Sequence, residues 1–336
     1  MYKDQGVNKR EKQKITINER TERLNSLFCN FLTNESLNNE DKALFLDIML
    51  EIGVKIPKDK ETLALALKNG FSEIVKISIE NGARVEEEFF VLALEKGDFE
   101  FANFLLDKAK NLCQSWGKGL EKVITLKQVE IVKKFITFGY DVNSNDGLAL
   151  ITAIRCCDEE IFDLLVEAGA DVKIKNNMPI IVAVSDKENI KIVEKLISLG
   201  VDVTAGNNAA LYNCLHSQCS SPDILKILIN EGVDVTSRNC EALEYCIRNR
   251  IYNFVEILLS TNRYTQEYIS FWLNYLCRTS LDVGFVKILL KYSPTKKTIK
   301  ECLKIVYPYS NARGGKDIYN ALKEALKKSK KKHHLF

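Results

Sequence analysis

Two neighbouring stretches, EIFDLLVEAGADV (160–172) and KIVEKLISLGVDV (191–203), decide how this chain folds. Both place apolar residues eight, seven, four and three positions before a glycine. That spacing is typical of one face of a 3.6-residue helix. A glycine directly after such a face is the expected left-handed end of a helix. Each stretch therefore predicts an amphipathic helix with a defined C-terminal stop.

The same pattern recurs along most of the chain, at intervals of 27 to 32 residues. Its nine copies close at Gly53, Gly82, Ala109, Gly139, Gly169, Gly200, Gly232, Asn262 and Ser293. Of the 36 helix-face positions, 35 are apolar, whereas a composition of 46% apolar residues predicts about 17. Small residues such as Ala153 and Ala183 recur sixteen or seventeen positions before the closing residue, which indicates an earlier, closely packed helix. Because one helix pair cannot bury its apolar face alone, the pattern predicts a stacked array.

These repeats resemble the ankyrin repeat, most closely in GADV (169–172) and in GVDV (200–203 and 232–235). The opening TPLHxA of the family pattern is eroded; its best copies are MPIIVA (178–183) and ETLALA (61–66), and the family's His is absent from every copy. The resemblance implies an all-α solenoid of stacked helix-turn-helix units with degenerate capping units at its ends.

The segments between repeats are shorter than in the family. Nine residues separate the closing glycine from the next helix four times in succession, after Gly139, Gly169, Gly200 and Gly232, where the family has about twelve. The missing residues fall in the β-hairpin fingers, so we expect almost no β-structure. Such short-finger repeats resemble those of ankyrin proteins from giant viruses and some AT-rich microbes. The resemblance covers about residues 40–293.

The sequence predicts a capping unit at each end of the array. Lys323 is polar at a helix-face position that is apolar in all nine copies, as a terminal repeat requires because nothing stacks on it. The predicted organisation is a polar N-terminal arm (1–21), degenerate N-terminal capping helices (22–57), ankyrin repeats (58–294), C-terminal capping helices (295–329) and a basic tail (330–336).

Length and charge exclude several classes of protein. A chain of 336 residues is too long for one ordinary core. Its formal charge of +3 is concentrated in residues 313–336, which carry a net +6, so the remaining body is acidic and nucleic acid is not the expected partner. No signal peptide and no membrane-spanning apolar run is present, so we expect a soluble, cytoplasmic protein in a reducing compartment. The lysine run at 327–332 leaves two alternatives open, a nuclear-import or anionic-surface patch and a solubilising tail.

The sequence offers no constellation for catalysis. None of the common nucleophile, zinc-protease or nucleotide-binding motifs appears, so we expect no enzymatic activity and no cofactor. Cys214, His216 and Cys219 are residue types that suit zinc. Cys214, however, occupies the small inward position of a first helix, and His216 points elsewhere around that helix. We therefore expect no metal and predict that the ten cysteines are free thiols.

The leading hypothesis is a non-enzymatic scaffold that binds a protein partner through the concave groove of the repeats. We expect it to be monomeric by itself, with no small-molecule substrate and no membrane. The alternative is a host-directed adaptor or effector, in which the repeats recruit a target and the flanking segments recruit other machinery such as a ubiquitin ligase. Residues 22–56 show no clear F-box pattern.

The resemblance also implies where a partner binds, because ankyrin-like proteins use their finger tips and the exposed late part of each first helix. By register, the late first-helix positions are Lys68, Asn69, Glu95, Lys96, Arg155, Ser185, Asp186, His216, Arg248 and Asn249. The finger residues are Asn145, Asn177, Asn208 and Arg238. These side chains are polar and vary between repeats, although a solvated surface alone would also favour polar residues there.

Overall fold

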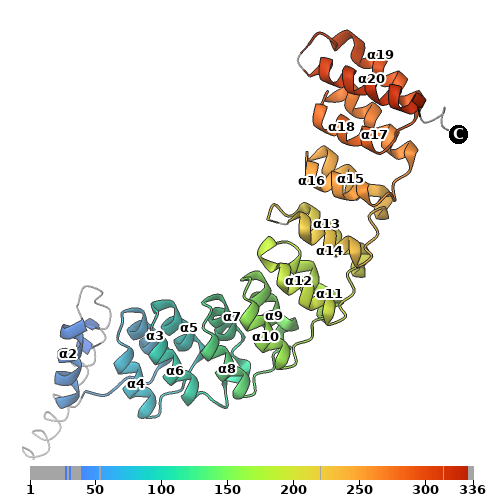
Figure 1. Ribbon diagram of the computed structural model, residues 1–336. Coiled ribbons are helices and arrows are strands. Elements are labelled where there is room, and N and C mark those ends of the chain that lie inside the picture. The colour runs from blue at the N-terminus through green and yellow to red at the C-terminus, as the bar shows by residue number, and fades with distance from the viewer. Residues whose placement is uncertain are drawn as a thin grey trace, which may run out of the picture. The chain divides into compact units, whose positions relative to one another are not determined.

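The computed structural model describes residues 27–28, 30–31, 39–52, 54–219, 221–312 and 314–331 (Figure 1). Over these ranges the chain is a succession of α-helices without β-strands, interrupted by a single isolated bridge between Asp186 and Cys219. The predicted all-α repeat architecture is confirmed. The predicted N-terminal arm, the closing residue Gly53 and residues 332–336 lie outside the described residues.

The chain divides into two compact units, which are described separately. Unit 1 comprises Met1–Cys156 and Asp163–Ala170, and unit 2 comprises Cys157–Phe162 and Asp171–Phe336. The helices up to the division are α2 (Asn39–Glu51), α3 (Lys60–Lys68), α4 (Ser72–Glu80), α5 (Glu87–Lys96), α6 (Phe99–Lys108), α7 (Gly117–Thr125), α8 (Val129–Thr137) and α9 (Ser144–Arg155). Helix α10 (Glu159–Glu167) contributes residues to both units.

Unit 2 continues the alternation of first and second helices, shown in green to red in Figure 1. Its helices are α11 (Ile174–Ala183), α12 (Ile190–Ser198), α13 (Ala205–His216), α14 (Pro222–Asn230), α15 (Ser237–Arg248), α16 (Tyr252–Ser260), α17 (Gln266–Thr279), α18 (Val283–Lys291), α19 (Lys296–Val306) and α20 (Gly315–Lys331). Three short 3₁₀ helices, η1 (Cys113–Ser115), η2 (Lys187–Asn189) and η3 (Tyr307–Tyr309), lie between them.

Apolar side chains hold the helices of each unit together. First helices pack on first helices, as α5 does on α7 and α13 on α15, and each also packs on the second helix that follows it. The helix faces predicted from the sequence form the core: Val132 and Phe135 of α8, for example, are fully buried. Burying a side chain of this size contributes about 1.5–3 kcal/mol, so stacking between repeats is the main source of stability.

The predicted helix stops are present. Gly232 has a φ of +95°, its N–H donates to the carbonyl of Ile229 (3.1 Å), and the N–H of Val233 donates to the carbonyl of Leu228 (3.2 Å). This pair of bonds satisfies carbonyls that the helix end leaves unpaired. The same conformation recurs at Gly82, Gly139, Gly169 and Gly200. Ala109 is the exception, with a φ of −95°, because the chain turns there into η1.

The shortened fingers are left-handed turns. In each, an aspartate accepts a hydrogen bond from the N–H two residues later; Asp234 and Thr236 are an example (2.9 Å). Three consecutive residues with positive φ follow, at 145–147, 175–177, 206–208 and 238–240. The third of them donates its N–H to the carbonyl four residues back, as Cys240 does to Thr236 (3.0 Å). One left-handed turn thus replaces the family's hairpin, and the expectation of almost no β-structure is confirmed.

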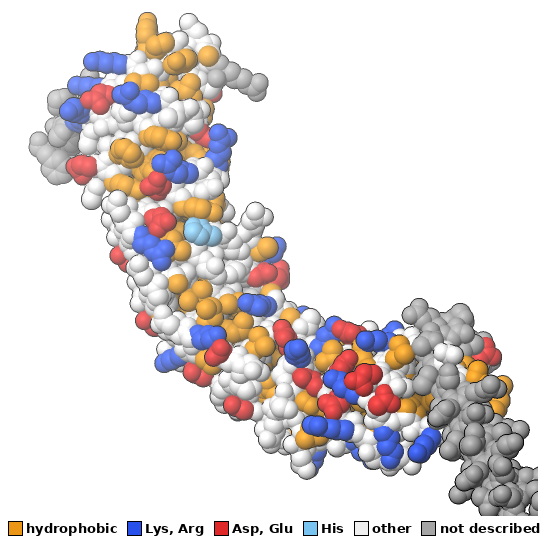
Figure 2. All heavy atoms as spheres, turned by 180° about the vertical axis from the view of Figure 1, so that it is seen from behind, with side chains coloured by type: hydrophobic (Ala, Val, Ile, Leu, Met, Phe, Trp, Pro, Cys, Tyr) orange, Lys and Arg blue, Asp and Glu red, His pale blue; other side chains and the backbone are white. Residues whose placement is uncertain are grey.

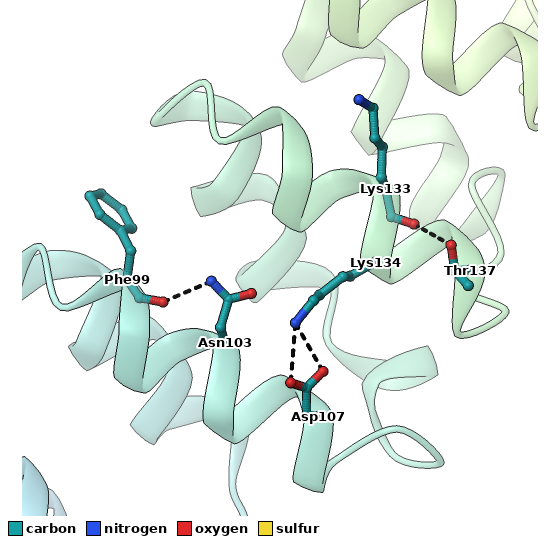
Figure 3. Close-up of polar contacts among 6 residues, drawn as sticks. All are labelled: Phe99, Asn103, Asp107, Lys133, Lys134 and Thr137. Carbon is teal, nitrogen blue, oxygen red and sulfur yellow. Dashed lines mark hydrogen bonds and ion pairs between the residues drawn. The ribbon is translucent and has the colours of Figure 1, made fainter.

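Polar contacts between second helices add little to this stacking. Lys134 of α8 lies 3.0 and 3.1 Å from the two carboxylate oxygens of Asp107 on α6 (Figure 3). Figure 3 also shows Asn103 donating to the carbonyl of Phe99 (3.0 Å), a bond within α6. Since both members of the Lys134–Asp107 pair are partly exposed, it contributes at most about 1 kcal/mol.

Helix α20 ends the array with a polar face. Ile318 and Leu322 are buried, whereas Lys323 is exposed with its ammonium 4.5 Å from the ring centroid of Tyr319. That residues 295–329 cap the array stays a prediction. Among the residues that the structure describes, no helix has both the length and the apolar composition to cross a membrane.

Candidate functional site

In unit 1, most of the predicted binding residues lie on exposed helix ends. Lys68 ends α3, and Glu95 and Lys96 end α5; all three are exposed. Glu95 is already paired with Lys122 of α7, whose ammonium lies 3.4 Å from its carboxylate. Arg155 is exposed at the last residue of α9. The late first-helix positions of unit 1 therefore form a charged surface.

The finger residue Asn145 begins a left-handed turn in unit 1. It is exposed, with a φ of +51°. Asparagine tolerates this conformation better than most residues because its short polar side chain bonds locally. Asn145 is therefore suited to the backbone conformation of this turn.

Two predicted residues are buried, so the expectation that they are exposed is wrong. Asn69 is 8% exposed at the C-terminal cap of α3, where its N–H bonds the carbonyl of Ala66. Asn208 is also 8% exposed, and its side-chain oxygen accepts the N–H of Asp234 in the next finger (3.0 Å). A buried side-chain amide needs such a partner, which gives Asn208 a role in the repeat itself, and the backbone of Asn69 caps α3. Neither presents a free side chain to a partner.

Two further residues lie beyond the helix on which the register placed them. Helix α11 ends at Ala183, so Ser185 and Asp186 belong to the following turn and not to the late first helix. The carboxylate of Asp186 accepts the N–H of Glu188 (3.0 Å) and starts η2. Asp186 also forms the isolated bridge to Cys219. This turn therefore serves contacts between repeats.

The remaining predicted residues of unit 2 are at the surface. Asn177 is half-buried in its finger, and the other four are exposed: His216, Arg238, Arg248 and Asn249. The guanidinium of Arg238 stacks on the ring of Tyr212, with 3.9 Å between its central carbon and the ring centroid. Asn249 caps α15, and its side-chain amide donates to the carbonyl of Tyr245 (2.9 Å).

Aromatic side chains join the predicted residues of unit 2 into one surface. The ring centroids of His216 and Tyr245 lie 4.2 Å apart. Arg248 lies over the next first helix, with its guanidinium carbon 5.5 Å from the ring of Trp272 and 5.6 Å from the ring of Tyr275. We call His216, Tyr245, Phe271 and Tyr275 the aromatic face; Trp272 is buried and contacts the rings of Phe271 and Tyr275. Figure 2 shows orange side chains beside the pale-blue histidine, whereas blue and red ones dominate the part of the view that shows unit 1.

Electrostatics fix the arginine within this surface. Glu244 accepts a hydrogen bond from Nε of Arg248 (2.7 Å), one helical turn earlier on α15. This bond raises the pKa of Arg248 further above its usual value, so the guanidinium stays charged. A planar cation held over aromatic rings can stack on a partner's aromatic groups and bond its carboxylates.

The sequence reasoning missed the aromatic members of this surface. Unit 1 shows the contrast, because the positions that correspond to Tyr245 and Tyr275 there carry Leu65, Leu92, Lys122 and Thr152. One feature of the sequence marks Phe271: it stands thirty residues after Glu241 and thirty before Glu301, so both neighbouring repeats carry a carboxylate where it carries a ring.

The cysteines show no arrangement for a metal. Cys214 is buried, whereas His216 and Cys219 are exposed. Within the described ranges, no group of three or more His, Cys, Asp or Glu side chains could hold a metal ion. No disulfide bond joins the cysteines of these ranges. Burial raises the pKa of Cys246 to about 12, so its thiol is protonated at neutral pH.

Comparison with known proteins places these repeats in a family. Residues 120–207 and 180–268 match the family described as ankyrin repeats in three copies. A stretch of 169 residues, 47% of the chain, is 30% identical to "Ankyrin repeat and KH domain-containing protein mask-1" of Caenorhabditis elegans and covers 6% of that protein. A stretch of 183 residues, 53% of the chain, is 25% identical to "Putative ankyrin repeat protein R599" of Acanthamoeba polyphaga mimivirus and covers 51% of it.

The fold and these matches define a helical repeat protein. Residues 120–268 contain ankyrin repeats, as the GADV and GVDV segments predicted. One of the two relatives comes from a giant virus, which agrees with the resemblance of the short repeats. The chain spans 6% and about half of the lengths of these two relatives.

Proposed function

We propose that this chain is a non-enzymatic scaffold that binds a protein partner through the late ends of its first helices and its fingers. These positions line the concave groove in ankyrin-like proteins. Ankyrin repeats generally mediate protein–protein interaction, which is the general support for the proposal. We further propose that the chain is monomeric by itself and acts in the cytoplasm, where reduced thiols such as Cys246 persist.

One observation carries the proposal. The helix faces turned toward the core hardly change from repeat to repeat, whereas the corresponding late positions carry Lys68, Glu95, Arg155, His216 and Arg248. Packing does not require this variation, because these side chains are exposed. The aromatic face adds exposed and half-exposed rings to the same positions in unit 2, and such rings are enriched where proteins bind one another.

A triple substitution of Arg155→Ala, His216→Ala and Arg248→Ala tests the proposal. Tagged protein captures partners from a host lysate, and quantitative mass spectrometry compares the triple variant with the wild type. We expect the proteins captured by the wild type to be lost from the triple variant, because it removes three exposed side chains from the proposed surface. Thermal unfolding should change little, since surface substitutions shift stability by only about 0.5 kcal/mol.

The matched control places three substitutions on exposed faces of second helices: Glu100→Ala on α6, Glu194→Ala on α12 and Lys287→Ala on α18. The control should keep the captured proteins. Loss of the captured proteins from the control, with full capture by the first-helix variant, would move the binding surface to the second helices and overturn the proposal.

A further inference from the structure

A hollow lies at the aromatic face, between first helices α17 and α19 of unit 2. Its volume is about 480 Å³, within the range of pockets that hold ligand groups. Phe271, Tyr275 and Arg278 line it from α17, and Thr295 and Thr298 line it from the start of α19. Glu267, Ser270 and Asn274 of α17 complete the lining, so the hollow is bordered by two rings, one cation, one carboxylate and several neutral polar groups.

Phe271 is not part of the core of its repeat. Its side chain is 60% exposed, although its ring lies 5.5 Å from the ring of Trp272. The helices α17 and α19 correspond residue by residue at a spacing of thirty, since Thr265 and Thr295 cap them in the same way. That register places Glu301 on α19 where Phe271 stands on α17. The two neighbouring repeats thus carry a carboxylate at this position, and three others carry Leu148, Met178 and Ala209, so the distinctive feature of Phe271 is the exposure of its ring.

Positive charge predominates on the helices that follow α17. One cation and one carboxylate line the hollow, Arg278 and Glu267, and Lys297 and Lys304 are exposed on the neighbouring helix α19. The wider region has the same sign: from Val283 to Lys331, leaving out Arg313, twelve lysines accompany three acidic residues. Charges of one sign attract an oppositely charged partner and orient it.

We propose that this hollow receives an apolar or aromatic side chain from an acidic segment of a partner protein. The rings of Phe271 and Tyr275 contact the anchoring side chain, and Arg278, Lys297 and Lys304 bind carboxylates on either side of it. The proposal rests on the proposed function of the first-helix face and names the chemistry of its partner. A nucleic acid or an anionic membrane would use the lysines without filling the hollow.

A display library of random peptides, selected on the full-length protein, tests this inference. We expect enriched peptides to carry one large apolar or aromatic residue with at least two Asp or Glu residues near it. The key variant is Phe271→Glu, because it introduces the residue that the repeat already carries at positions 241 and 301. A synthetic enriched peptide should bind this variant about tenfold more weakly or worse, as for a central anchor of an interface.

Charge reversal gives a second, independent measurement. The pair Lys297→Glu and Lys304→Glu should weaken the same peptide by about tenfold, and added salt should reduce the difference. The matched controls lie away from the hollow: Leu199→Ala removes an exposed apolar side chain at the end of α12, and Lys287→Glu reverses an exposed charge on α18. Both controls should keep the affinity of the wild type.

Several results would overturn the inference. They are the failure to enrich any peptide, enrichment without acidic residues, and equal affinity for the wild type and Phe271→Glu. Displacement of the peptide by a single-stranded oligonucleotide or by phosphatidylserine vesicles at equal charge would assign the surface to a different class of partner. If these results appear while the triple variant still loses its captured proteins, the partner chemistry is wrong and the proposed function stands. If the peptides behave as expected and the triple variant captures normally, the partner chemistry stands and the proposed function is wrong.

Discussion

Replacing Gly232 by alanine measures how much a glycine with a left-handed backbone at the end of a second helix contributes to stability. Gly232 follows α14 with a φ of +95°, a backbone conformation that disfavours a Cβ atom by about 1–2 kcal/mol. A Cβ built at this position meets no atom within 4 Å, so steric clash adds nothing. The alanine also loses less chain entropy on folding, which offsets about 0.4–1 kcal/mol. We therefore expect Gly232→Ala to lower the free energy of unfolding by about 1 kcal/mol.

Urea unfolding followed by circular dichroism measures this change, and the melting temperature should fall by about 2–4 °C. The control is Glu231→Ala at the preceding residue, which is exposed and has a right-handed φ of −79°; it should shift stability by less than about 0.5 kcal/mol. The complementary change, Asn262→Gly, relaxes a φ of +55° one repeat later and should raise stability. A loss from Gly232→Ala no larger than that from Glu231→Ala would refute the role assigned to the closing glycines.

Two further predictions concern titration and thiol chemistry. Hydrogen bonds from the Thr236 side chain and backbone lower the pKa of Asp234. The carboxylate therefore stabilises the folded protein above about pH 4, the pKa of an unfolded aspartate. This stabilisation is lost as the pH falls through the lower pKa of the folded state. In urea titrations, Asp234→Asn should thus be less stable than the wild type at pH 7, and the gap should close in acid; a gap that persists unchanged would contradict this. In native thiol labelling followed by mass spectrometry, exposed Cys219 should react early and buried Cys246 late. The pKa of about 12 of Cys246 leaves little thiolate to react. Equal labelling rates of the two cysteines would contradict the burial of Cys246.

The sequence was sufficient for the repeat architecture because the determinants are local and repeated. The left-handed φ of Gly139 or Gly200 requires a glycine or a tolerant residue, and the helix before it requires apolar residues at fixed offsets. The fingers were predictable only in length. Their left-handed turns are built from residues such as Lys175 and Arg238, which have no preference for positive φ, although neighbours such as Asn176 do.

The candidate site was less predictable, because it depends on contacts between repeats. Asn69 and Asn208 are polar, yet both are buried; the next finger supplies the partner of the Asn208 side chain, and no pattern within one repeat signals this. The aromatic face arises because His216, Arg248 and Phe271 come from three successive first helices. Position in the sequence identified two of these three residues, and only the contacts of His216 with Tyr245 and of Arg248 and Phe271 with Trp272 show how they form one surface.

Hydrogen–deuterium exchange of the full-length protein, alone and in complex with a purified captured partner, tests most directly whether the late first helices bind that partner. Backbone amides at the ends of α13, α15 and α17 should exchange more slowly in the complex, because the partner covers Arg248 and its neighbours. Amides of the second helices α14 and α16 should exchange as they do in the free protein. Protection confined to α14 and α16, with unchanged exchange in α13, α15 and α17, would contradict the account.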